Sequence, residues 1–139
     1  MGVRKTARAL AMTVAGLTSM AAPRPAVAHH SFSAEFDASK PFKMTGQVTK
    51  VEWTNPHTFF YVDVTNEKTG KVETWAMEMG SPNALMRAGW TRNSMKAGDI
   101  VTVEGSLAKD GSHTGNARSV LLAATGKQLF AASSQGEAR

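Results

Sequence analysis

Four histidines are the residues with the clearest potential for chemistry, and none lies in a stretch expected to form the core: His29, His30, His57 and His113. If a signal peptidase cuts after Ala28, His29 becomes the first residue, and its α-amine and imidazole can chelate one metal ion together. Copper(II) favours such a nitrogen-rich, tetragonal site. We therefore expect copper bound by His29 and His57, with His30 and His113 as further ligands. Zinc suits the set less well, because its sites usually include cysteine or carboxylate.

In the alternative interpretation these histidines bind no metal. His29 and His30 then belong to a flexible start of the mature chain, and His57 is a turn residue that hydrogen-bonds to a nearby carbonyl. Aromatic residues then offer a second candidate site. Phe59 and Tyr61 should point outward from one strand, and Asn55 lies in the turn before it. Such a face suits a protein, peptide or saccharide partner. The opposing interpretation is that the N-terminal arm or the C-terminal tail covers these rings.

Other side chains have simpler interpretations. Met77 and Met79 could bind copper(I), but their alternation with Trp75 favours core packing. The tryptophans are expected to anchor the core. Three carboxylates are expected near the histidine site: Glu35, Asp37 and Glu78. Their spacing does not pair them as a catalytic acid and base.

Catalysis has little support in the sequence. It contains no Gly-x-Ser-x-Gly elbow, no phosphate-binding glycine loop, no His-Glu-x-x-His motif and no cysteine. We therefore expect a non-enzymatic binding module. A copper-dependent oxidative enzyme is the third alternative.

The N-terminus has the pattern of a cleavable signal peptide covering residues 1–28. Basic residues precede an apolar stretch over 9–22, and Ala26-Val27-Ala28 fits a peptidase site. The stretch has about 14 residues, fewer than the roughly 20 that a membrane-spanning helix needs. We expect a periplasmic or secreted protein that does not span the membrane.

Charge argues against nucleic-acid binding. The chain has 16 Lys and Arg against 11 Asp and Glu, but four of the basic residues lie in the expected signal peptide: Arg4, Lys5, Arg8 and Arg24. The mature chain keeps 12 basic residues against the same 11 acidic ones, which is close to neutral. A nucleic-acid-binding domain normally carries a basic patch. We expect a metal ion, a small ligand or a protein as the partner.

The mature chain is predicted to be all-β with one short helix. An N-terminal arm (29–41) should precede one domain (42–130) and a flexible tail (131–139). A bulge near Thr49-Lys50 would restore the alternation of the first strand, and Ser81-Pro82 is typical of a helix start. Three strands, a helix and two strands predict an OB-fold-like, five-stranded, partly open barrel. A short edge piece should end near Phe130.

Several motifs in the mature chain resemble a family of small exported bacterial proteins known only as a domain of unknown function. They are His29-His30-Ser31-Phe32, Val51-Glu52-Trp53-Thr54-Asn55-Pro56-His57, Gly80-Ser81-Pro82-Asn83-Ala84-Leu85, Gly89-Trp90-Thr91, Gly98-Asp99 and Asn116-Ala117-Arg118-Ser119-Val120. The resemblance covers nearly the whole mature chain. It implies export and a single β-domain, and it transfers no activity.

Overall fold

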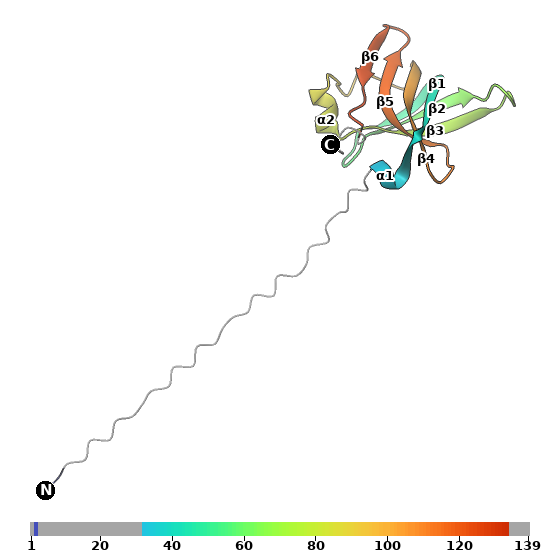
Figure 1. Cartoon of the computed structure of the whole chain (residues 1–139). Helices are drawn as coiled ribbons and strands as arrows, with labels where there is room; N and C mark the ends of the chain where they lie inside the picture. Colours follow the sequence, from blue (N-terminus) through green and yellow to red (C-terminus); the bar gives the residue numbers. More distant parts are fainter. Residues whose placement is uncertain (1, 3–31, 134–139) are drawn as a thin grey trace.

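The structure is a computed structural model that describes residues 2 and 32–133. The predictions for the signal peptide, for His29 and His30, and for most of the tail lie outside these residues. Six strands and two short helices follow one another along the described chain (Figure 1). Their bounds are α1 Phe32–Glu35, β1 Phe36–Glu52, β2 Phe59–Thr65, β3 Val72–Glu78, α2 Pro82–Arg87, β4 Ile100–Ala108, β5 Thr114–Leu122 and β6 Lys127–Phe130.

Five of the strands form a ring. Neighbours in the order β3-β2-β1-β4-β5 pair antiparallel, and β5 pairs in parallel with β3. β5 pairs with two further strands along its length. Residues 114–116 pair with β3, and residues 119–122 pair with the edge strand β6. α2 lies between β3 and β4 in the chain. This strand order and helix position confirm the predicted OB-like arrangement, and β6 is the expected short edge piece.

β1 is long and irregular, which lets it pair with two strands that diverge from each other. Its pairing with β2 shifts register between Val48 and Lys50, so the bulge predicted at Thr49-Lys50 is confirmed. The strand begins at Phe36, earlier than the start expected near Phe42, because Phe36 pairs with Ala108 of β4. A second register shift separates this pair from the regular pairing that resumes at Pro41.

The core lies on the inner face of the ring. Alternation along β2 and β3 places Phe60 and Val62 inside with Met77, and Met79 follows just beyond β3. The prediction that Met77 and Met79 pack in the core is confirmed, since they are 0% and 1% exposed. Burying each such side chain stabilises the fold by about 1.5–3 kcal/mol.

α2 packs against the core through Leu85 and begins as the sequence predicts. The hydroxyl of Ser81 accepts a hydrogen bond from the Ala84 backbone N–H, and Pro82 occupies the first helical turn. Gly89 follows the helix with φ of 92°, a conformation that glycine adopts without strain. The apolar side of the helix buries Leu85 completely. Figure 1 shows α2 far from the hairpin that joins β2 and β3.

Candidate functional site

His57 lies in the turn between β1 and β2 and faces a buried carboxyl. The turn contains a cis peptide bond between Asn55 and Pro56, and the Thr54 hydroxyl donates to the His57 carbonyl at 3.1 Å. Nδ1 of His57 lies 3.6 Å from Oε1 of Glu78, at the end of β3. About a quarter of the histidine side chain is exposed, but only 7% of the glutamate side chain. The imidazole therefore lies between the buried carboxyl and solvent.

Glu78 is held in place by strand pairing and by a hydrogen bond. It pairs with Phe59 of β2 on one side and with Asn116 of β5 on the other, so the three side chains share one face. Nδ2 of Asn116 donates to Oε1 of Glu78 at 3.2 Å, and the Ser133 hydroxyl hydrogen-bonds to Oδ1 of Asn116. Asn116 is 1% exposed. The amide thus links the end of β3 to the segment that follows β6.

The pKa of Glu78 is raised to about 7. Burial is the main cause, because removal from water disfavours the charged carboxylate. The negative charge of Glu35 adds to the rise, while the hydrogen bond from Asn116 opposes it. Near neutral pH this carboxyl can therefore gain or lose a proton, unlike an ordinary surface glutamate.

Helix α1 is anchored close to the Glu78 cluster, which consists of His57, Glu78 and Asn116. Phe32 and Phe36 stack with ring centroids 5.7 Å apart and form a small buried cluster with Ala108. The backbone N–H of Lys109 donates to the Glu35 carbonyl at 2.9 Å, and its ammonium donates to the Ser33 carbonyl at 2.6 Å. These contacts fix α1 against the end of β4.

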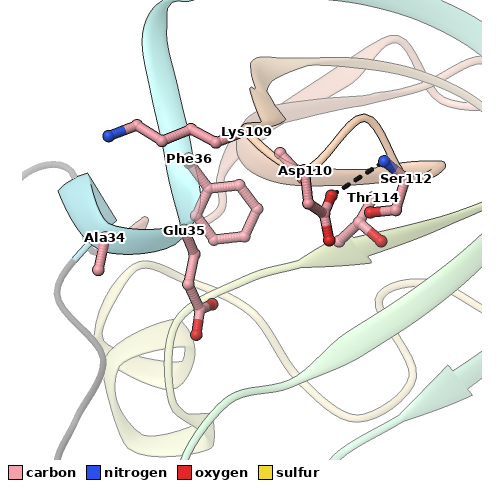
Figure 2. A pocket seen from close by; sticks show the side chains of 8 residues that line it. Ala34, Glu35, Phe36, Lys109, Asp110, Ser112 and Thr114 are labelled. Carbon is pink, nitrogen blue, oxygen red and sulfur yellow. Dashed lines mark hydrogen bonds between the residues drawn. The ribbon is translucent and has the colours of Figure 1, made fainter.

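A pocket of about 330 Å³ opens between α1 and the loop that joins β4 and β5. In Figure 2, the Glu35 carboxyl extends below Phe36, while Asp110 and Thr114 lie across the pocket. The Asp110 carboxylate accepts a 2.9 Å hydrogen bond from the Ser112 backbone N–H, and hydrogen bonds from Ser112 lower its pKa. The pocket therefore adjoins the Glu78 cluster through Glu35.

His113 belongs to a different neighbourhood. Its ring stacks on Trp75 with centroids 4.6 Å apart, and its Nε2 lies 3.9 Å from Oε2 of Glu73. Glu73 and Glu78 are five positions apart on β3, so their side chains lie on opposite faces of the strand. The structure thus places His57 and His113 against different carboxyls and does not bring them together. Among the described residues, no group of three or more His, Cys, Asp and Glu side chains is arranged to hold a metal ion.

The second candidate site lies on β2 and the turn before it, and its tyrosine already has partners. Phe59 is half-buried. The Tyr61 hydroxyl donates to Oε2 of Glu52 at 3.1 Å, and the Lys50 ammonium lies 5.6 Å from the centre of its ring. Asn55 is exposed in the turn. Tyr61 is therefore covered in part by neighbours on β1.

Sequence reasoning singled out His57, Glu35 and Glu78 separately and missed Asn116 as a member of the site. The sequence placed Asn116 at the end of a loop rich in glycine, serine and aspartate, whereas the structure begins β5 at Thr114. The burial of Asn116 depends on β5 lying next to β3, a contact between strands far apart in the chain. No local pattern reveals such a contact.

A family model described as "Family of unknown function (DUF6152)" matches residues 16–117. No curated protein and no solved structure gives a significant match. Within the part of the chain that the structure describes, no helix is long and apolar enough to cross a membrane.

Proposed function

The chain belongs to this family of unknown function, and we propose that it is an exported, non-enzymatic binding module that holds copper(II) through His29 and His57. His29 would act as the mature N-terminal residue, supplying its α-amine and its imidazole. His30 is the candidate for an additional nitrogen. His113 is left out of this proposal, because it contacts Trp75 and Glu73 instead.

The contact between His57 and Glu78 carries the proposal. Histidines that bind metals usually direct their second ring nitrogen at a carboxylate or carbonyl, which fixes the ring and makes it a better ligand. Here Nδ1 of His57 faces the Glu78 carboxyl at 3.6 Å, so Nε2 lies on the opposite side of the ring. Asn116 in turn holds the carboxyl. This is the support that a single metal-binding imidazole requires.

The anchoring of α1 supports the participation of His29. Phe32, at the start of α1, is buried against Ala108, and His29 precedes it by only three residues in the sequence. Glu35, at the end of the same short helix, is close enough to Glu78 to raise its pKa. If the chain is cut after Ala28, this effect of Glu35 on Glu78 is the observation that favours a ligand from the new N-terminus at the His57 site. A free amine and two imidazoles match the preference of copper(II) for nitrogen ligands.

The proposal is tested by copper(II) titration of protein exported and processed in a bacterial host. Mass spectrometry would establish the cleavage site, and calorimetry with electron paramagnetic resonance would establish affinity and ligand type. We expect one copper ion with a nitrogen-rich spectrum, lost when one extra alanine precedes His29. His57→Asn should remove most of the affinity, whereas the matched control His113→Asn should leave it unchanged. Binding that is indifferent to both the extra alanine and His57→Asn would refute the proposal.

A metal-free adaptor using Phe59, Tyr61 and Asn55 is the alternative function. The contacts of Tyr61 with Lys50 and Glu52 make it the weaker candidate, because a partner would have to displace them. The double variant Phe59→Ala with Tyr61→Ala should leave copper binding intact. An oxidative copper enzyme would additionally require turnover with a reductant and oxygen.

A further inference from the structure

A second pocket lies at the opposite end of β3 from Glu78, beneath the hairpin that joins β2 and β3. It has a volume of about 370 Å³. Its apolar lining comes from three neighbouring strands, with Met44 of β1, Val64 of β2 and Trp75 of β3. All three side chains are half-buried and pack against the edge of the core. The pocket is therefore an opening at one end of the inner face of the ring.

Trp75 forms a rigid wall of this pocket. His113 stacks on its ring at an interplanar angle of 18°. The His113 backbone carbonyl accepts a 2.9 Å hydrogen bond from the N–H of Ala76, and its Nε2 lies 3.9 Å from Glu73. Because His113 covers one face of this ring, a ligand in the pocket would pack against the part of the indole that lines it. Little conformational entropy is then lost, since the ring is already held in place.

The rim of the pocket is polar and nearly balanced in charge. It consists of Asn66, Glu67, Lys68 and Glu73. Nδ2 of Asn66 donates to Oε1 of Glu73 at 2.9 Å, and Oδ1 of Asn66 accepts from the backbone N–H groups of Lys68 and Thr69. The rim thus presents carboxylate acceptors beside an ammonium donor on a preformed turn.

We infer that this pocket binds a neutral saccharide, with one sugar ring packed against Trp75. A sugar ring has an apolar face of C–H groups, which suits the negative face of an indole. Its hydroxyls both donate and accept, which suits a rim that offers acceptors from Glu67 and Glu73 and a donor from Lys68. A strongly charged ligand would meet carboxylates and an ammonium together, so the mixed rim favours a neutral one. This site is independent of the copper proposal, because it shares no residue with it.

The test uses the processed, ¹⁵N-labelled protein and three defined probes: maltotetraose, cellotetraose and chitotetraose. Heteronuclear NMR should show that at least one of them shifts the Trp75 indole signal and the amide signals of Asn66 and Lys68. Trp75→Leu should weaken binding about tenfold or more, as expected for the loss of an aromatic stacking contact, and Trp75→Phe should restore part of it. Trp53→Leu is the matched control, since Trp53 is also half-buried against the core but does not line the pocket.

Exposed variants keep the test informative if Trp75→Leu does not fold. Lys68→Ala should weaken saccharide binding about fivefold through the loss of one charge-assisted hydrogen bond. Lys71→Ala should have no effect, because this lysine lies in the same hairpin and does not line the pocket. The inference is overturned if no tetrasaccharide binds at millimolar concentration. It is also overturned if cyclohexanol and phenol occupy the pocket as well as any sugar, or if the shifts map to Phe59 and Tyr61 instead.

Discussion

Replacing Glu78 by glutamine should make the stability of the metal-free protein much less sensitive to pH. Glu78 is the buried carboxyl whose pKa lies near 7, well above its ordinary value of 4.5. The folded state therefore binds its proton more tightly than the unfolded chain does. Between pH 4.5 and about pH 7 the folded protein holds more protons than the unfolded chain. Its free energy of unfolding therefore falls as pH rises through this range.

The size of this effect follows from the shift in pKa. A rise from 4.5 to about 7, at about 1.4 kcal/mol per pKa unit, sets an upper limit of about 3 kcal/mol. The partly exposed imidazole of His57 lets solvent screen this charge, so we expect a loss of about 2 kcal/mol. Glutamine keeps an oxygen that can accept from Asn116, and it has no charge to bury. Glu78→Gln should therefore equal the wild type in acid and exceed it above neutral pH.

The assay is urea unfolding at a series of pH values from 4.5 upward, with a chelator present in every sample. Glu73→Gln is the matched control, because Glu73 lies on the same strand and also faces a histidine, but its side chain is 28% exposed. The control should follow the wild-type dependence on pH. If Glu78→Gln loses stability with rising pH as steeply as the wild type does, burial of this carboxyl has no energetic consequence and the reasoning fails.

Three further substitutions test other parts of the structure. Ser81→Ala should lower the free energy of unfolding by about 1 kcal/mol in urea titrations, because it removes the N-cap of α2; an unchanged midpoint would contradict this. Gly105→Ala should cost about 3 kcal/mol or prevent folding, as judged by circular dichroism, because the new Cβ would lie 2.0 Å from the Asn116 carbonyl oxygen. Phe32→Ala should weaken copper(II) binding about tenfold in calorimetry by loosening α1, with the main core intact; equal affinity would show that this anchor does not position the N-terminus.

Local patterns were sufficient for most of the fold. Alternating apolar residues predicted β2 and β3, since one face of each strand packs in the core. The change of alternation after Val48 predicted the bulge in β1, because only an extra residue returns the apolar side chains to the inner face. The early start of β1 was not predicted. Residues before Pro41 lack a regular period, and their pairing depends on contact with β4.

The candidate site was predictable only in part. His113 was expected beside His57 as a further copper ligand, but a backbone hydrogen bond places it elsewhere. The carbonyl of His113 accepts from Ala76, which places the histidine beside the middle of β3 and its ring on Trp75. The partnership of His57 with Glu78 depends on the turn around Asn55 and on the register between β2 and β3. Neither can be read from spacing alone.

The two ends of the described domain meet at the same place. Glu35, at the start of the domain, interacts electrostatically with Glu78, and Ser133, at its end, is hydrogen-bonded to the Asn116 that holds Glu78. A purification tag, fluorescent protein or surface linker attached at either end would therefore crowd the His57 site. The hairpin around Thr69 and Gly70 is exposed and remote from α2 (Figure 1), so a label there leaves the His57 site free. It suits copper titrations but not saccharide titrations, because the same turn forms the rim of the Trp75 pocket.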